Sequence, residues 1–313
     1  MGRGISVLLV GALGRASPGR EVANTLETRF VTAPITKLFT AVAVLQLVGR
    51  GRLALDDSIH AHVDLAGTTI GRGVTLRHLL THTSGIADLA EEDLGEEYAE
   101  VFRAHPCHVF EAVADFLPLF ARKPPHVPPE EVRRYCNAGY LLAGLAIEGA
   151  SGTGYQEYVE SEIFVPAAMS RSGFFDKRYA IEDLAEGFDP DDEGRLEQNI
   201  YAYPPKGAAD GGAFCTSGDL HRFVHAVRRG VLLPADLTKL FLTPQVEIDQ
   251  ETRQGFGLEF DAASWWKEGC SEGASGIVRH YEALDANVVV LANSMRGAWP
   301  VVAEIDRLAA LSS

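Results

Sequence analysis

The longest strongly apolar stretch of the chain runs from Pro34 to Val48. Its apolar positions (35, 38, 39, 42, 44, 45 and 48) cover nearly every face of a helix. A helix with so few polar positions lies inside a domain and not on its surface. Thr32 is a suitable N-cap, Pro34 suits the first turn, and Gly49 or Gly51 ends the run. The pattern therefore predicts a buried central helix.

Periodicity predicts strands near both ends of the chain and helices between them. The expected elements are a first strand at Ile5–Val10, mainly helices from about 70 to 200 with loops at 123–130 and 186–193, and a helix near Asp219, followed by strands at 256–266, 276–282 and 287–292 and a closing helix at Val301–Leu311. This order predicts an α/β fold with an all-α insertion, in which both chain ends contribute to one antiparallel sheet. Residues 1–65 and 205–313 would form the sheet region and 66–204 the helical insertion, all in one compact unit.

Composition and charge limit the kinds of molecule that the protein is expected to bind. The chain has 313 residues, of which 46% are hydrophobic, so it can bury a full core without a metal ion or disulfide. Its net charge of −15 argues against nucleic acid and against an anionic membrane surface. No run of 18 apolar residues is present, so no membrane-spanning segment is expected. These features favour a small-molecule partner and leave the oligomeric state open.

Localisation and metal binding depend on weaker signals. Arg3 with Ile5–Val10 is an alternative, short signal peptide, although a first strand is the preferred interpretation. The four cysteines are scattered without a CxxC pair, which indicates reduced thiols and a cytoplasmic protein. His221 and His225 have the spacing of a metal pair, but no third ligand motif accompanies them. We therefore expect no metal and no cofactor.

Three spaced motifs carry a family resemblance. Segment 77–85 reads RHLLTHTSG, segment 134–140 reads RYCNAGY and segment 211–220 reads GGAFCTSGDL. Their identity and order resemble the serine β-lactamase and penicillin-binding-protein superfamily, in the branch of class C β-lactamases, esterases and D,D-peptidases. The resemblance implies a β-lactamase/transpeptidase-like fold with a pocket where the two parts of the chain meet.

The first catalytic motif of that superfamily is altered. It reads Ser-x-x-Lys at the start of the central helix, which places the lysine one turn from the serine. Here the lysine is Lys37, so Pro34 occupies the position of the nucleophile. Proline has no Oγ and no backbone N–H, and the resemblance implies that this N–H is one of two oxyanion donors. Loss of one such donor typically costs about 10²–10³ in rate, so acyl-enzyme chemistry at Pro34 is not expected.

The third motif, Lys-Thr-Gly or His-x-Gly on a strand facing the pocket, is also changed. An ungapped count back from Gly276 aligns it with Cys270, Ser271 and Glu272. A thiol thus replaces a cation or imidazole, and a carboxylate replaces glycine. A thiol beside Glu272 would have a raised pKa and be a poor nucleophile.

Lys37, Tyr135 and Asn137 match two motifs of the superfamily. The resemblance implies that they meet in one pocket, where the lysine and tyrosine move protons and the asparagine orients the substrate. Desolvation would lower the pKa of Lys37, and a neighbouring ammonium would lower that of Tyr135. The alternative is a purely structural lysine that is hydrogen-bonded to the other two. Gly212 and one of Trp265 and Trp266 are further candidates for substrate contact, because strand alternation sends the two rings to opposite faces.

Three functional hypotheses follow. The leading one is a repurposed, non-hydrolytic enzyme, such as an isomerase, cyclase or lyase, that acts on a small carbonyl-containing molecule. Lys37 and Tyr135 would be its acid–base pair, Asn137 would orient the substrate, and Cys270 or Glu272 would assist. The second is a catalytically dead binding or scaffold protein. The third is an esterase or acyltransferase with a relocated nucleophile such as Cys270.

Overall fold

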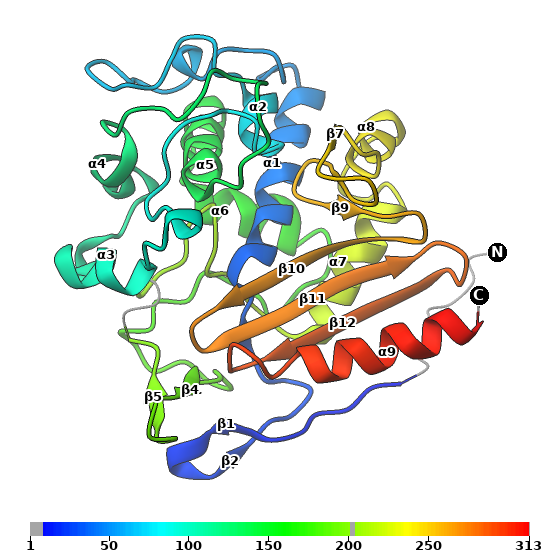
Figure 1. Ribbon diagram of the computed structural model, residues 1–313. Helices are drawn as coiled ribbons and strands as arrows, with labels where there is room; N and C mark the ends of the chain where they lie inside the picture. The colour runs from blue at the N-terminus through cyan, green and yellow to red at the C-terminus, as the bar shows by residue number, and fades with distance from the viewer. Residues whose placement is uncertain (1–8, 201–203, 313) are drawn as a thin grey trace.

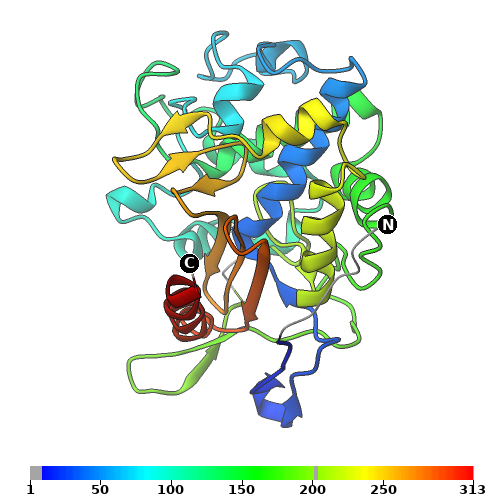
Figure 2. The same cartoon turned by 90° about the vertical axis from the view of Figure 1, so that its right-hand side faces the viewer.

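The computed structural model describes residues 9–200 and 204–312. Its main sheet is antiparallel and has six strands in the order β12-β11-β10-β9-β8-β7. The long strands are β10 (Ser264–Ser271), β11 (Ala274–Tyr281) and β12 (Ala286–Ala292), and the short ones are β7 (Val246–Glu247), β8 (Arg253–Gln254) and β9 (Glu259–Phe260). Helix α9 (Trp299–Ser312) covers one face of the sheet, while α1 (Lys37–Gly49) and α7 (Ser217–Arg228) lie on the other (Figures 1 and 2). These elements confirm the predicted strands at 276–282 and 287–292, the helix near Asp219 and the closing helix. The strand predicted at 256–266 is instead divided between β9 and the start of β10.

Short helices and loops form the region above the sheet in Figure 1. The helices are α2 (Leu76–Leu80), α3 (Tyr98–Ala104), α4 (Leu117–Phe120), α5 (Asn137–Ser151) and α6 (Tyr155–Val159), with α8 (Ala235–Phe241) following α7. The longest of them, α5, packs against α1. The largest hydrophobic cluster takes residues from this region and from the sheet. The division at 65/66 and 204/205 stays a prediction.

The fold class is confirmed, but the N-terminal strands pair differently from the expectation. All six strands of the main sheet come from residues 246–292. Near the N-terminus, β1 (Arg15–Ser17) pairs with β2 (Val22–Ala23), and β3 (Phe30–Val31) pairs with β6 (Phe214–Cys215); β4 (Phe188–Pro190) and β5 (Leu196–Gln198) form a separate hairpin. Pro18 and Gly19 turn the chain straight after β1. The Asn293 side chain then joins β1 to the end of β12 by donating to the Arg15 carbonyl oxygen at 3.0 Å.

Most of the predicted first strand, Ile5–Val10, lies outside the described residues, and its last two residues, Leu9 and Val10, are exposed and not in a strand. Within the described ranges no helix combines the length and the apolar character needed to cross a bilayer.

The predicted central helix is present, but its first turn differs. Residues Ala33–Thr36 form a 3-10 helix, η2, and α1 begins only at Lys37. Thr32 precedes this turn without capping it, because its hydroxyl donates to the Ala213 carbonyl oxygen at 2.9 Å. Ala33 has φ +45°, a strained value for a residue that has a Cβ and precedes a proline. From Lys37 to Leu47 every residue of α1 is buried, as the apolar pattern predicts.

Strand β10 packs directly on η2, and Gly269 makes this close approach possible. A Cβ at Gly269 would overlap the Thr32 carbonyl oxygen and press on the Ile35 side chain. Small size is therefore required at this position.

We expect Gly269→Ala to lower the free energy of unfolding by about 1–3 kcal/mol, the usual cost of overpacking. Urea denaturation monitored by circular dichroism measures it. Gly71→Ala is the matched control, since a Cβ there meets nothing within 4 Å. Equal stability of the two variants would show that β10 can move away from η2 at no cost.

Candidate functional site

The predicted trio of Lys37, Tyr135 and Asn137 meets at the start of α1. Lys37 is 0% exposed, and its Nζ donates to Asn137 Oδ1 at 2.5 Å and to the Asp210 carbonyl oxygen at 2.6 Å. The same Nζ lies 5.1 Å from the centroid of the Tyr135 ring. Three segments far apart in the sequence therefore converge on one ammonium group.

Pro34 lies in η2, one turn before Lys37, and is half-buried. Its neighbour Thr36 offers no replacement hydroxyl, because that side chain is buried and accepts a hydrogen bond from the Ala213 N–H at 3.1 Å. The Thr36 hydroxyl is also 3.0 Å from that of Thr32. The segment thus presents no available hydroxyl nucleophile next to Lys37.

Asp88 is part of this site and was missed by the sequence analysis. Its buried carboxylate accepts the backbone N–H groups of Asn137 at 2.7 Å and Ala138 at 2.8 Å, so it caps the N-terminus of α5 from another segment. It also accepts its neighbour's N–H, that of Leu89, at 2.8 Å. Burial raises the pKa of Asp88 to about 6. In the sequence, only its position three residues after the RHLLTHTSG segment could have indicated that Asp88 belongs to the site.

Lys267 is a second buried cation that the sequence analysis missed. It is 3% exposed, and its Nζ lies 5.4 Å from the Tyr135 ring centroid and 3.2 Å from Glu259 Oε1. Tyr135 therefore has an ammonium group near its ring from α1 and another from β10. Side chains alternate along β10, so Lys267 lies on the same face as Gly269, which packs on η2. This alternation could have predicted from the sequence that Lys267 faces the site.

The electrostatics confirm one expectation and correct another. Burial lowers the pKa of Lys37 to about 8, as expected. The pKa of Tyr135, in contrast, is raised well above its usual value, because burial and the charges of Asp88, Asp210 and Glu92 all disfavour the phenolate. The expected lowering by a neighbouring ammonium is therefore wrong, and Tyr135 is a neutral phenol at physiological pH.

The Tyr135 hydroxyl is buried, and among the residues that the structure describes it has no hydrogen-bond partner. Leaving a buried polar group unpaired typically costs about 1–3 kcal/mol. Asn137, in contrast, is fully engaged, because its Nδ2 donates to the Tyr98 hydroxyl at 2.5 Å while its Oδ1 accepts from Lys37. The Tyr135 hydroxyl is thus the polar group of the trio without a partner among the described residues.

Cys270 and Glu272 lie at the end of β10 and in the turn after it. Position 270 alternates with position 269, so Cys270 faces away from η2; its Sγ is 3.6 Å from the Met295 carbonyl oxygen. Burial, followed by the charges of Asp189, Glu268 and Glu92, raises the pKa of the thiol. Burial and the charge of Glu97 raise the pKa of Glu272. The hydrogen bonds of the trio involve neither of these side chains.

The other candidate contact residues are packed inside the protein. Trp265 is in the main core, with its ring centroid 5.2 Å from that of His280, whereas Trp266 packs in the cluster beneath α9. Alternation separates the two rings as predicted, but both are buried, so neither stands as the exposed wall of a pocket. Gly212 is also buried, in a loop with φ +87°, two residues after the Asp210 carbonyl that binds Lys37.

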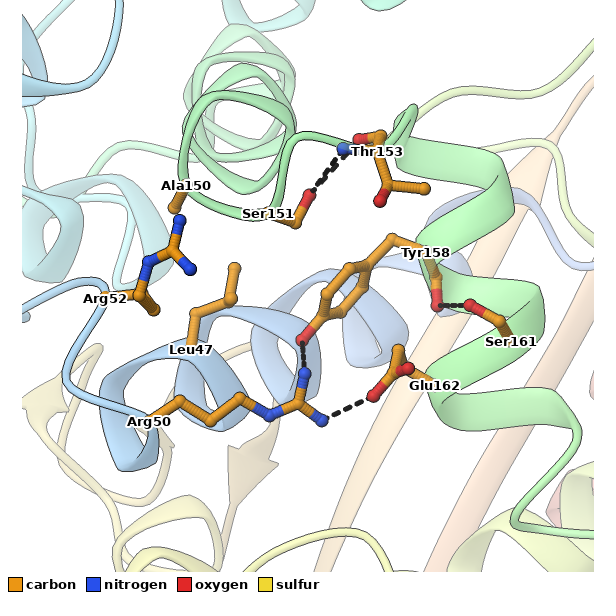
Figure 3. Close-up of a pocket in the computed structure, with 9 residues that line it drawn as sticks. All are labelled: Leu47, Arg50, Arg52, Ala150, Ser151, Thr153, Tyr158, Ser161 and Glu162. Carbon is orange, nitrogen blue, oxygen red and sulfur yellow. Dashed lines mark hydrogen bonds and ion pairs between the residues drawn. The ribbon is translucent and has the colours of Figure 1, made fainter.

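A cavity of about 210 Å³ lies at the other end of α1 (Figure 3). Leu47 and Arg50, at the C-terminal end of α1, line one side of the cavity, and Tyr158 and Glu162 line the opposite side. Arg50 donates to the Tyr158 hydroxyl and forms an ion pair with Glu162, so these polar groups already have partners. Given about 1.5 Å per residue, the helix separates this cavity from Pro34 by about 20 Å.

Comparison with known proteins agrees with this architecture. The structure is similar to the crystal structure of a penicillin-binding protein from Bacillus halodurans, with 33% identity, a TM-score of 0.94, and coverage of 98% of this chain and 94% of that chain. A D-stereospecific amidohydrolase from Streptomyces sp. is 26% identical with a TM-score of 0.74, over 86% of this chain and 83% of that chain.

Curated relatives by sequence are also penicillin-binding proteins, but the similarity covers a smaller part of each chain. Penicillin-binding protein 4* of Bacillus subtilis is 30% identical over 63% of this chain and 44% of its own length. Penicillin-binding protein 4 of Amycolatopsis lactamdurans is 28% identical over 68% of this chain and 54% of its own length. The chain thus spans about half the length of these curated relatives. The Beta-lactamase family itself matches residues 3–312, and the chain therefore belongs to the β-lactamase family.

Proposed function

We propose that this chain binds a small carbonyl-containing molecule reversibly at Tyr135 and forms no acyl-enzyme with it. The observation that carries the proposal is Pro34, which supplies neither a hydroxyl nor a backbone N–H at the position where the superfamily resemblance places its nucleophile. This favours the binding-protein hypothesis over hydrolysis.

The hydrogen bonds of Lys37 support reversible binding. An ammonium has three donors, and two of those of Lys37 are used by Asn137 and the Asp210 carbonyl. With no hydroxyl one turn away, the lysine has no serine to deprotonate. Its contacts instead hold α1, α5 and the 210–213 loop together.

The Tyr135 phenol supplies the polar contact for a ligand. Its hydroxyl is buried and unpaired, and its raised pKa keeps it a hydrogen-bond donor at neutral pH. A carbonyl oxygen is the acceptor that would satisfy it. The names of the structural and curated relatives refer to penicillin and to an amidohydrolase, and an amide carbonyl is the simplest group of this kind.

A relocated thiol nucleophile receives less support. Cys270 faces away from η2, and burial and three carboxylates raise the pKa of its thiol. A thiol in that state is a weak nucleophile.

The second candidate is proton transfer, and the pKa of Lys37 favours it. At a pKa of about 8, a substantial fraction of Lys37 is a neutral amine near neutral pH, while Tyr135 stays a proton donor. Such a pair can remove a proton beside a carbonyl and stabilise the enolate by a hydrogen bond. An isomerase, cyclase or lyase would use this chemistry.

For the binding function, we expect Tyr135→Phe to weaken the binding of N-ethylacetamide about three- to tenfold, which corresponds to one neutral hydrogen bond. Ligand-observed NMR titration measures the affinity. Tyr179→Phe is the control, because that side chain is 72% exposed. Unchanged affinity in Tyr135→Phe would remove Tyr135 from the site.

For the second candidate, we expect the protein to accelerate the exchange of the α-protons of cyclohexanone in D₂O, followed by proton NMR. The rate should rise as pH increases through about 8, because Lys37 acts as a base only when neutral, and then level off while Tyr135 remains protonated. Lys37→Met should abolish the acceleration. A rate equal to that in buffer would leave plain binding as the function.

A further inference from the structure

We propose that the ligand of this site carries a positive charge, as a protonated amine near the carbonyl that Tyr135 contacts. The inference rests on the proposed function and adds the charge class of the ligand. It comes from two observations: the Tyr135 hydroxyl is buried without a partner among the described residues, and the charges of Asp88, Asp210 and Glu92 act on it.

The interior of the site holds charges of both signs in equal number. Lys37 and Lys267 are its two ammonium groups, and Glu259 forms an ion pair with Lys267 at 3.2 Å. Arg133 is a third cation, whose charge acts on the neighbouring His82 and Tyr140. Asp88, mostly ionised at neutral pH with a pKa of about 6, and Asp210 are the other two buried carboxylates, so a surplus of negative charge has to come from the rim.

The rim adds carboxylates from three segments. Glu92 lies in the 3-10 helix η4 (Glu92–Leu94), Glu97 directly precedes α3, and Glu272 lies in the turn between β10 and β11. Glu97 is next to Tyr98, whose hydroxyl accepts from Asn137, so α3 begins beside the trio. The turn is held in place, because the Asn199 side chain donates to the Glu272 carbonyl oxygen at 2.9 Å and the Gly273 N–H donates to Asp189 at 2.5 Å.

The rim carboxylates act electrostatically on one another and on groups of the site. Glu92 acts on Tyr135 and also on Cys270 at the end of β10. Burial raises the pKa of Glu272, and the negative charge of Glu97 raises it further, as expected for two neighbouring carboxylates. Arg103 on α3 opposes them as the rim's nearby cation. The rim therefore keeps an excess of negative charge.

This excess sets the size of the expected preference. The three rim carboxylates less the charge of Arg103 leave a net of two negative charges. For a ligand charge placed about 8–10 Å from them, in a water-like dielectric at low salt, this net charge favours a monocation over a monoanion about five- to tenfold. The same field disfavours free carboxylates as ligands.

Three probes of similar size test the inference: N-acetylethylenediamine, which is a cation, N-acetylglycine, which is an anion, and neutral N-ethylacetamide. All three carry the amide carbonyl. We expect the affinities, measured by ligand-observed NMR at about 20 mM salt, to fall in the order cation, neutral, anion. The preference should shrink at about 500 mM salt, where the Debye length is a few ångströms.

The double substitution Glu92→Gln and Glu272→Gln should reduce the cation-to-anion ratio to about twofold or less. The control double substitution, Glu251→Gln and Glu304→Gln, removes the same charge at exposed positions outside the rim and should keep the ratio.

Equal affinities of all three probes, with Tyr135→Phe weakening each, would overturn the charge inference while the binding function stands. Tighter binding of the anion, or an unchanged ratio in the rim variant, would also overturn it. Absence of binding by the cation would contradict this inference, and absence of binding by the neutral probe would contradict the proposed function.

Discussion

The ammonium group of Lys37 is the contact on which the arrangement of the molecule depends. It lies within the hydrophobic core at the start of α1, and taking such a charge out of water costs several kcal/mol unless partners compensate. Asn137 at the start of α5 and the carbonyl of Asp210 are those partners, and the carboxylates of Asp210 and Asp88 stabilise the charged form. One buried cation thus fixes the positions of the central helix, the helical region and the loop that leads to α7.

This structural demand explains why Lys37 can persist beside Pro34. A lysine kept only to activate a serine would lose its role once the serine is absent. Here, removal of the lysine would leave Asn137 Oδ1 and the Asp210 carbonyl without their donor inside the core, at a cost typical of buried unsatisfied groups. The Tyr135 hydroxyl has no such engagement among the described residues. Lys37 therefore holds the fold together, whereas Tyr135 is the residue that we propose for ligand binding.

The parts of the structure that follow from periodicity and motif spacing were predictable, and those set by long-range packing were not. The buried helix and the last two strands followed from the apolar pattern, and the meeting of Lys37, Tyr135 and Asn137 followed from the family resemblance. The 3-10 turn at Ala33–Thr36 did not, because it depends on the approach of β10 at Gly269 and on the contacts of Thr32 and Thr36 with Ala213. The direction of the Tyr135 pKa was also missed, since it is decided by burial and by Asp88, Asp210 and Glu92, which lie far away in sequence or carry no motif.

Intact-protein mass spectrometry of the wild-type chain, after incubation with benzylpenicillin, p-nitrophenyl acetate and an acyl thioester, tests the central claim most directly. The Pro34→Ser variant, which has both a hydroxyl and a backbone N–H beside Lys37, is treated with the same reagents for comparison, to test whether acyl transfer occurs at this position. The account predicts no covalent adduct on the wild-type chain with any of the three reagents. An adduct on the wild-type chain that forms with saturation kinetics and maps to one side chain, Cys270 included, would contradict it.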